Sequence, residues 1–379
     1  MIGAGPAGSM LGYYLAKSGF DVLIVEKAFL PRYKPCGGGI PAKTIQNLPF
    51  DTLPGLEFMS TGGIITYQGE QKLKVKVDRE FAWLAMRDKF DKHLVEQAVD
   101  AGASILEGKR VTAVSLEKDG VSVSTHAEEI RGQFVAGADG VNSIVAKSSG
   151  LIPRREVGTA IEAELKVSQD ALDEQGAFAT FDFGALPHGY GWIFPKKDHL
   201  SVGVFQARSG KAINLKDFLG RFIECQPVLM DHKVLKIQGH KIPLGGKQET
   251  LHKGRCLLVG DAANLADPFL GEGIYHAIQS AAFAAEAIRD NLQNGNVDLS
   301  GYSRRVNTEI VSDFRYARLF ANLVYRLPRF ATTLFSRSPV MQNAVFGVIR
   351  GDLSFKQLNN QIILKFPVIL TQAVINRGE

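Results

Sequence analysis

The feature that most constrains the fold is a glycine motif at the start of the chain, Gly3-Ala-Gly5-Pro-Ala-Gly8. Glycines at this spacing allow a tight turn, a close approach of the backbone to a pyrophosphate, and close packing of the next helix on a sheet. A helix over residues 9–18 and a buried strand over residues 21–26 are predicted to follow. Glu26 stands 18 residues after Gly8, where a carboxylate can accept hydrogen bonds from ribose hydroxyls. The segment therefore predicts an α/β domain of the Rossmann type that binds a dinucleotide.

Only Met1 and Ile2 precede this motif, which ordinarily follows a central parallel strand. We expect the chain to lack most of its first strand, which would leave backbone hydrogen-bonding groups unpaired. A version extended by strand residues is therefore expected to fold and hold its cofactor better. Equal melting temperatures and cofactor occupancy for the two versions would contradict this expectation.

The rest of the chain predicts two further kinds of structure. Alternating apolar and polar residues at 60–85 and 157–207 predict an antiparallel sheet with one solvated face. A buried strand over 256–259 precedes an alanine-rich helix, and the pattern is helical from Tyr302, interrupted by Pro328 and Pro339. We therefore predict a discontinuous nucleotide-binding domain (1–50, 86–150 and 255–300), an inserted antiparallel-sheet substrate domain (51–85 and 151–254) and a helical C-terminal region (301–379).

Composition is that of a globular protein rather than a disordered one. Apolar residues make up 45% and charged residues 22% of the 379, which is typical of a globular enzyme. No apolar run reaches the roughly 20 residues that span a bilayer. The cysteines Cys36, Cys225 and Cys256 lack the spacing of metal ligands, so we expect no metal site and a reduced, cytoplasmic location. Cys225 and Cys256 are both expected in the core.

Positive charge is concentrated at the C-terminal end. Residues 301–379 carry a net charge of +7, which leaves −2 for the rest of the chain. A basic tail with interleaved aromatics, as in residues 314–320, can lie against an anionic membrane surface as a peripheral contact. The alternative is a basic helix packed on its own domain with solvated charges. No nucleic-acid-binding motif accompanies the charge, and the sequence leaves the oligomeric state open.

Two further motifs appear in order along the chain, Gly137-Ala-Asp139-Gly140-Val-Asn-Ser143 and Gly260-Asp261-Ala-Ala followed by Gly271-Glu-Gly273-Ile274. With the first motif they resemble a large family of FAD enzymes that contains aromatic hydroxylases and geranylgeranyl reductases. The resemblance implies that Asp261 hydrogen-bonds the ribityl chain and that the helix opened by Gly271–Ile274 meets the flavin pyrimidine edge. The cofactor contacts it implies are Gly3, Gly5, Ala7, Gly8, Glu26, Lys27, Arg87, Asp139, Asp261, Gly271, Gly273 and Ile274.

Two more stretches are similar to geranylgeranyl reductases within that family. Residues 31–40 match a PxxKxCGGG segment, and Tyr190-Gly-Trp192-Ile-Phe194-Pro195 matches a YxWxFP signature. Residues 351–355 are also similar to the end region of the family, so the resemblance covers nearly the whole chain. One departure is Phe205, which replaces a glycine that relatives often carry and is expected to reshape the substrate cavity. Gly38, Gly39, Tyr190, Trp192 and Phe194 are the expected substrate contacts.

The residues themselves suggest how an isolated alkene could be reduced. Hydride addition alone would create an unstabilised carbanion, so a proton must arrive with or before the hydride. Tyr190, Trp192 and Phe194 alternate and therefore share one face of a strand, where an aromatic wall can stabilise positive charge. An ordinary cysteine thiol keeps its proton at neutral pH, so Cys36 is a candidate proton donor or a gate for one. The alternatives are that these aromatics are core and that Cys36 fills space beside the flavin.

Polar residues outside these motifs carry weaker expectations. Lys34, Lys196 and Lys197 could pair with a substrate diphosphate, although solvated surface lysines are commoner. His188 and His276 are expected to make local hydrogen bonds rather than to act in catalysis.

The leading hypothesis is an FAD-dependent oxidoreductase that reduces isoprenoid double bonds of a geranylgeranyl chain. One alternative is a flavin monooxygenase that hydroxylates a small aromatic compound, which would leave the CGGG and YxWxFP segments unexplained. A second alternative is a flavoprotein that binds a lipid or pigment without turning it over. Either NADPH or a ferredoxin-like protein can be the electron donor, because the sequence has no second dinucleotide loop to decide between them.

Overall fold

A small parallel sheet near the N-terminus carries the glycine motif. A computed structural model describes residues 1–77, 79–153, 156–207 and 213–375. Strand β1 (Leu23–Val25) pairs in parallel with β7 (Ser104–Leu106), and β11 (Val135–Gly137) pairs in parallel with β18 (Cys256–Leu258). Ile2 bridges Val25 on one side and Gly137 on the other, so the short first segment joins the two pairs. The buried position of the Met1 amine, which donates to Leu23 O at 2.6 Å, lowers its pKa to about 5.

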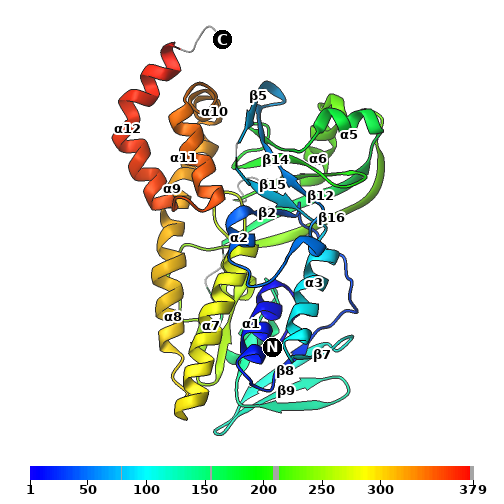
Figure 1. Ribbon diagram of the computed structural model, residues 1–379, viewed down its shortest axis with the longest axis vertical. Coiled ribbons are helices and arrows are strands. Elements are labelled where there is room, and N and C mark those ends of the chain that lie inside the picture. The colour runs from blue at the N-terminus through cyan, green and yellow to red at the C-terminus, as the bar shows by residue number, and fades with distance from the viewer. Residues whose placement is uncertain (78, 154–155, 208–212, 376–379) are drawn as a thin grey trace.

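Four helices pack around this sheet, three of which stand together in Figure 1. They are α1 (Pro6–Lys17), α3 (Arg87–Asp100), α4 (Ile144–Ser149) and α7 (Ile274–Asn294). Close contacts join α1 to both α3 and α7. Three antiparallel strands, β8 (Val111–Leu116), β9 (Val121–Thr125) and β10 (Glu129–Gly132), form a separate small sheet beside α4, and the two-residue β17 (His252–Lys253) extends β18. The predicted Rossmann-type architecture is confirmed.

The substrate half is built on a seven-stranded sheet. Its order is β16 (Lys233–Leu244), β12 (Glu156–Lys166), β15 (Leu200–Gln206), β14 (Gly189–Pro195), β13 (Phe178–Phe183), β4 (Gly62–Tyr67) and β5 (Glu70–Lys76). The expectation of a fully antiparallel sheet is wrong at one pair, since β13 and β4 run parallel. These two strands are far apart in sequence and no hairpin joins them, so no turn constrains their relative direction.

The expected solvated face of this sheet is also absent at its centre, where every residue of β14 and β15 is buried. On one face Ile193, Val202 and Val204 pack with Phe222 of α6 (Leu215–Glu224). On the other face Tyr190, Trp192 and Phe194 belong to a cluster that includes residues of the C-terminal helices. The residues that alternate with the large ones are the small Ser201, Gly191 and Gly203 rather than charged side chains, which is why burial on both faces is possible.

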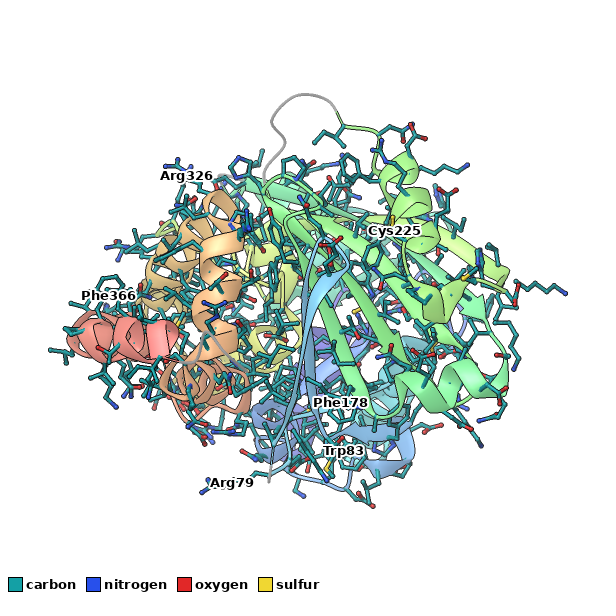
Figure 2. All side chains as sticks on the ribbon, turned by 90° about the horizontal axis from the view of Figure 1, so that it is seen from above. Arg79, Trp83, Phe178, Cys225, Arg326 and Phe366 are labelled. Carbon is teal, nitrogen blue, oxygen red and sulfur yellow. The ribbon has the colours of Figure 1, made fainter. Side chains whose placement is uncertain are left out.

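Short elements link the two halves. An antiparallel three-stranded sheet has the order β2 (Gly39–Pro41), β6 (Ala82–Leu84) and β3 (Phe58–Ser60). Between β2 and β3 the chain forms α2 (Ala42–Gln46) and a turn of 3-10 helix at Leu53–Gly55. The remaining pieces of the substrate half are α5 (Gln169–Gln175) and a 3-10 turn at Pro227–Leu229. Cys225, predicted to be core, is instead exposed at the carboxyl end of α6 (Figure 2), whereas Cys256 is buried in β18 as predicted.

The C-terminal region is helical as predicted, as far as residue 375. It comprises α8 (Ser300–Val306), a π-helical turn at Asn307–Val311, α9 (Ser312–Arg326), α10 (Pro328–Arg337), α11 (Pro339–Arg350) and α12 (Phe355–Ile375). Pro328 and Pro339 open α10 and α11, where a missing backbone N–H costs least. The last helix, α12, stands at the outer edge of the molecule beside α9–α11 (Figure 1). By length and composition alone it could cross a membrane, and little of it is buried.

Candidate functional site

The glycine motif forms an open cradle in front of α1. A side chain at Gly8 is impossible, because its Cβ would lie 1.9 Å from the carbonyl oxygen of Gly3. Gly5 is the N-cap of α1, and no described side chain caps the backbone N–H groups of the first turn. Those N–H groups and the positive end of the helix dipole are therefore available to a phosphate.

Glu26 holds the cradle from the end of β1. Its two carboxylate oxygens accept hydrogen bonds from Ala4 N at 2.8 Å and Ala28 N at 3.0 Å. The side chain is buried yet lines the cavity described below, as does the neighbouring Lys27. A ribose contact through Glu26 therefore stays a prediction that the geometry permits.

Arg87, expected to meet the cofactor, lies in a buried ion-pair cluster. Its guanidinium donates to both oxygens of Asp91 at 2.8 and 2.9 Å. Arg32 donates to Asp91 at 3.1 Å and lies 3.6 Å from Glu26. Burial lowers the pKa of Arg87, but Asp91 and Cys36 outweigh that effect and raise it. Arg32 was not singled out from the sequence, and it ties the end of β1 to α3.

The second motif is organised by Asp139. One carboxylate oxygen accepts the N–H groups of Ile144 and Val145 at the start of α4, at 2.7 and 3.2 Å. The other oxygen is buried without a hydrogen-bond partner among the described residues. Burial raises the pKa of this carboxyl group.

The third motif turns beneath α7. Asp261, in a 3-10 turn at Gly260–Ala263, faces Lys34 with 3.8 Å between carboxylate and amine. Gly271 has φ +69°, and Gly273 is the N-cap of α7, which begins at Ile274. The loop between them depends on Asp267, whose carboxylate accepts the N–H groups of Phe269, Leu270 and Glu272. Asp267 was missed in the sequence, although an aspartate before a proline-containing turn is a known turn signal.

All three motifs line one cavity of about 660 Å³, a volume suited to a cofactor and part of a substrate. Of the residues expected in the site, the following are on its wall: Gly3, Gly5, Ala7, Glu26, Lys27, Cys36, Gly38, Gly39, Arg87, Asp139, Tyr190, Trp192, Phe194, Asp261, Gly271, Gly273 and Ile274. Gly8 is not on the wall, because it is pressed against Gly3.

The YxWxFP residues form an aromatic wall of this cavity. The Trp192 ring lies 6.2 Å from that of Tyr190 and 6.3 Å from that of Phe194, measured between centroids. The Tyr190 hydroxyl donates to Leu270 O at 2.7 Å, whereas the Trp192 indole N–H has no partner among the described residues. The Phe205 ring centroid lies 5.5 Å from that of Tyr190, and Phe205 also lines the cavity. That it reshapes the substrate space stays a prediction.

The CGGG loop packs directly against this wall, so the two family-specific segments meet. A Cβ at Gly37 would lie 2.9 Å from the Trp192 indole nitrogen, and Gly38 has φ +67° with its Cβ position 2.0 Å from Ala85 O. Only glycine fits at Gly38. The sulfur of Cys36 accepts the Gly38 N–H at 3.4 Å.

The three lysines considered as partners for a diphosphate have different surroundings. Lys196 is buried, and its amine donates to Gly37 O at 2.7 Å and Ala85 O at 3.0 Å, so it fastens the CGGG loop. Lys197 is exposed and is not on the cavity wall, while Lys34 is. Of the three, Lys34 is the lysine placed to meet an anion inside the cavity.

Four polar residues beside the cavity escaped the sequence analysis: Tyr33, Glu162, Glu164 and His199. Glu162 and Glu164 are almost fully buried on β12. Their alternation with Ile161, Ala163 and Leu165 was interpreted as a solvated strand face, which is the usual meaning of that pattern. No group of three or more potential metal ligands was found in the part of the chain that the structure describes.

These features fit FAD. The uncapped start of α1 suits a pyrophosphate, and the unpartnered oxygen of Asp139 and the start of α7 face the same cavity. The cavity then continues to the CGGG loop and the aromatic wall, where a second molecule has room.

Comparison with known proteins agrees with this assignment. A family model described as FAD binding domain matches residues 1–183. An uncharacterised protein of Methanosarcina barkeri is 33% identical over 380 residues, covering 100% of this chain and 95% of the relative. A digeranylgeranylglycerophospholipid reductase of Methanopyrus kandleri is 30% identical over 351 residues, covering 86% of this chain and 90% of the relative.

The fold has a solved counterpart as well. The crystal structure of a geranylgeranyl bacteriochlorophyll reductase-like protein from Thermoplasma acidophilum superposes with a TM-score of 0.79 at 22% identity, covering 99% of this chain and 98% of that one. Because the reductase from Methanopyrus kandleri matches most of both chains, this chain belongs to the geranylgeranyl reductase family of FAD-dependent oxidoreductases.

Proposed function

We propose that this protein reduces isolated carbon–carbon double bonds of a geranylgeranyl chain that is attached to a diphosphate, a pigment or a lipid. The observation that carries the proposal is the direct contact between the CGGG loop and the aromatic wall inside the cavity of the nucleotide motifs. A thiol and a row of aromatic rings at one end of a flavin site suit the protonation and reduction of an apolar chain. The names of several relatives point to the same class of substrate.

The reaction requires one hydride and one proton. When bound, reduced FAD supplies the hydride, and the π bond of the alkene breaks as two C–H bonds form. The proton must come from a group of the chain at the same end of the cavity. Protonation at or ahead of hydride transfer gives the more substituted carbon cationic character, which is more favourable than an unstabilised carbanion.

Tyr190, Trp192 and Phe194 have two roles in this scheme. Aromatic faces attract a cationic centre by about 0.5–2 kcal/mol per contact. The same rings exclude water, which would otherwise capture the cationic carbon. Tyr190 is held in place by its bond to Leu270 O, so the wall is fixed before the substrate enters.

Cys36 is the proposed proton donor. Its sulfur accepts the Gly38 N–H at 3.4 Å, and the residue lines the cavity together with the aromatic wall. Cys36→Ala should slow alkene reduction about 100-fold and leave flavin binding unchanged. The matched control is Cys225→Ala, because Cys225 is exposed at the end of α6. An unchanged rate in Cys36→Ala would assign that residue to packing alone.

The reaction itself is tested by product mass. FAD-loaded protein is reduced with dithionite and incubated without oxygen with geranylgeranyl diphosphate. A product heavier by pairs of hydrogen atoms is expected, and replacing dithionite by NADPH or by a reduced ferredoxin then identifies the donor class. An unchanged substrate on a fully flavin-loaded protein, with diphosphate, pigment and lipid head groups each tried, would refute the proposal and call for an aerobic test of hydroxylation.

We further propose that α12 rests on an anionic membrane surface from which a greasy substrate is taken. Its residues Ile363, Leu364 and Ile375 are each exposed by more than 70%, and Phe366 projects at the outer edge of the molecule (Figure 2). The helix contains lysines but no acidic residue, and the C-terminal region carries +7. An exposed apolar face with surrounding positive charge is the pattern of a surface-bound helix.

Co-sedimentation with lipid vesicles tests this contact. Ile363→Asn combined with Leu364→Asn should abolish binding to vesicles containing anionic lipid, and added salt should weaken the binding of the unchanged protein. Leu235→Asn with Ile237→Asn, at exposed positions of β16, is the matched control. Binding that survives the α12 substitutions would contradict the proposal, and release by detergent alone would indicate a spanning helix instead.

A further inference from the structure

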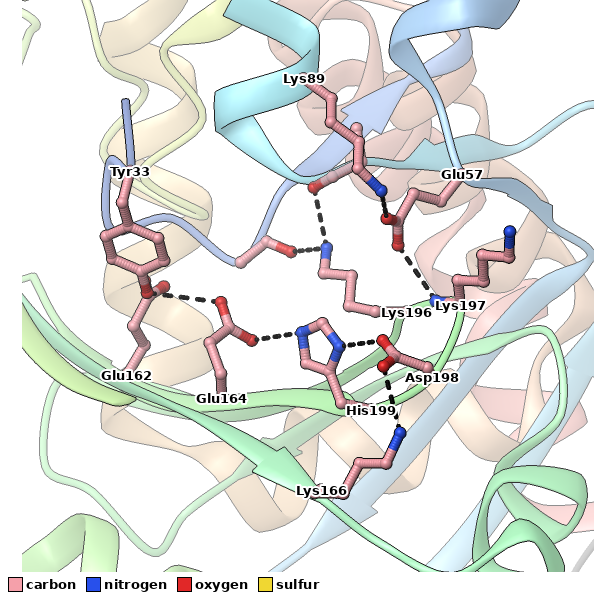
Figure 3. A network of polar contacts seen from close by, with 12 residues as sticks. Tyr33, Glu57, Lys89, Glu162, Glu164, Lys166, Lys196, Lys197, Asp198 and His199 are labelled. Carbon is pink, nitrogen blue, oxygen red and sulfur yellow. Dashed lines mark hydrogen bonds and ion pairs between the residues drawn. The ribbon is translucent and has the colours of Figure 1, made fainter. Parts of the chain in front are cut away.

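Two buried carboxylates on β12 share a tyrosine hydroxyl. The Tyr33 hydroxyl lies 2.7 Å from Glu162 Oε1 and 3.4 Å from Glu164 Oε1 (Figure 3). Glu162 and Glu164 are 3% and 4% exposed, and being two residues apart on a strand they point to the same face. Carboxylates this close and this buried favour the uptake of a proton over two full negative charges.

The network continues outward to solvent through His199. This imidazole has Nε2 3.1 Å from Glu164 Oε2 and Nδ1 2.8 Å from Asp198 Oδ1 (Figure 3). The Asp198 side chain is 65% exposed and accepts from Lys166 at 3.1 Å. An imidazole held at both nitrogens can receive a proton on one side and release one on the other.

The network continues inward to the cavity through Glu162. This carboxylate lines the same cavity as Cys36. Burial raises the pKa of Glu162 to about 7, so that it both gains and loses protons near neutral pH. The series of contacts thus runs from an exposed side chain to the cavity wall that also carries the proposed proton donor, with its longest step, 3.4 Å, between Tyr33 and Glu164.

Neither carboxylate is neutralised by a described lysine or arginine. The nearby Lys196 amine donates to Gly37 O and Ala85 O, and the Lys236 amine lies over the Tyr33 ring, 3.6 Å from its centroid. The charged or titratable groups that face the pair are therefore Tyr33, His199, Lys196 and Lys236. Buried charges are ordinarily paired with opposite charges. Here the possible counter-charge is His199: burial lowers its pKa, but the contacts with Glu164 and Asp198 raise it overall. Unlike a guanidinium, an imidazole can also give up its proton.

We propose that Asp198, His199, Glu164, Tyr33 and Glu162 form a proton relay from solvent to the cavity wall at Cys36. The proposal rests on the reductase function proposed above, because each double bond reduced consumes one proton at the cavity wall. His199 takes a proton on its Asp198 side and releases one to Glu164. Tyr33 then accepts from Glu164 as it donates to Glu162, and Glu162 returns the proton to the cavity where Cys36 has given one up.

Only O–H and N–H bonds change along the relay, the S–H bond of Cys36 is restored at its end, and one proton is transferred in total. The 3.4 Å gap between Tyr33 and Glu164 must shorten during transfer, since it exceeds the usual O–H···O distance. The rate should fall as pH rises through about 7, where Glu162 loses its proton.

The first test compares His199→Ala with the unchanged protein in a single turnover of the reduced, flavin-loaded enzyme. We expect a loss of about 10-fold or more in the rate of alkene reduction. Imidazole added to the buffer should restore much of that rate, which a merely structural role would not allow. Asp182→Asn is the matched control, because Asp182 is a buried carboxylate of the same sheet that bonds Thr66 and Gly69 instead. A full rate in His199→Ala, or a loss that imidazole does not restore, would overturn the relay.

The second test needs no substrate. Burial raises the pKa of both Glu162 and Glu272 to about 7, so the band assigned to Glu162 is the infrared difference between the unchanged protein and Glu162→Gln. That difference should show a protonated carboxyl group that appears as pH is lowered through about 7. Tyr33→Phe should shift its midpoint, and Asp182→Asn should leave it in place. Absence of this band would overturn the relay even if alkene reduction is observed. Presence of the band in a protein that reduces no alkene would refute the proposed reaction while leaving the proton-sharing network intact.

Discussion

Two buried carboxylate clusters lie next to the segment of residues 31–36, and they are neutralised in different ways. Arg32 joins the first cluster, where Asp91 is bonded by two guanidinium groups. The next residue, Tyr33, joins the second cluster, where Glu162 is bonded by a hydroxyl. One short segment therefore holds both clusters, and adjacent side chains reach opposite sides of it.

The difference implies that the first cluster has a fixed charge and a structural role, whereas the charge of the second cluster can change with pH. Guanidinium groups stay charged at all relevant pH values, so the first cluster holds the nucleotide loops in one arrangement. Hydroxyl and imidazole groups can give and accept protons, so the second cluster can change its charge near neutral pH. The first cluster should therefore be sensitive to the loss of a partner, and the second to pH.

The largest expected effect follows from breaking the first cluster. Asp91→Ala leaves Arg87 and Arg32 without their shared carboxylate, and Arg87 is fully buried. Removing one partner of a buried ion pair typically costs about 3–5 kcal/mol. Denaturant unfolding should show this loss, together with weaker flavin binding. Glu96→Ala on the same helix is the control, because its pair with Lys92 is at the surface and should be worth less than about 0.5 kcal/mol.

The second prediction concerns how stability depends on pH. Burial raises the pKa of Glu162 from 4.5 to about 7, so the folded state holds a proton that the unfolded state releases. Glu162 therefore makes its full contribution to the free energy of unfolding below about pH 4.5. That contribution, about 3 kcal/mol, is lost as pH rises to about 7. Relative to the unchanged protein, Glu162→Gln should therefore become more stable as pH rises through this range. Parallel stability profiles for the two proteins would contradict proton uptake at Glu162.

The part of the molecule that carries the three nucleotide motifs was largely predictable from sequence. Gly3, Gly8 and Gly271 are required by local backbone geometry, and local geometry leaves a mark in the spacing of residues. The motifs around Asp139 and Asp261 likewise belong to single turns, each followed by a helix. Their meeting in one cavity follows from the fold class, because these turns come at the carboxyl ends of neighbouring parallel strands.

The cluster of Tyr33, Glu162 and Glu164 was not predictable in the same way, because its side chains are brought together by segments far apart in the sequence. Tyr33 and Glu162 are 129 residues apart, and the alternation around Glu162 and Glu164 gave no sign of burial on both faces. Tertiary contacts also determine three other features that the sequence did not predict. These are the parallel pairing of β4 with β13, the exposure of Cys225, and the hydrogen bonds by which Lys196 holds the CGGG loop. The domain boundaries stay predictions.

A smaller effect is expected from removing the hydroxyl between the two glutamates. Tyr33→Phe keeps the ring under Lys236 but removes the hydrogen bond to Glu162, which is worth about 2 kcal/mol when the carboxylate is ionised. The loss should therefore be greater at pH 8 than at pH 5, measured by denaturant unfolding at both. An equal loss at the two values would indicate that Tyr33 serves packing rather than proton sharing.

The smallest effect tests a lysine that lies against the tyrosine of the second cluster. Lys236 lies over the Tyr33 ring from the exposed strand β16, and such surface contacts contribute about 0.5–1 kcal/mol. Lys236→Met keeps most of the apolar stem and removes the charge, so stability should fall by less than about 1 kcal/mol. Losing a positive charge near Glu162 should also move the midpoint of its infrared titration to higher pH. A large loss of stability would mean that Lys236 neutralises the carboxylates in the way that Arg87 and Arg32 neutralise Asp91, and the distinction between the two clusters would then fail.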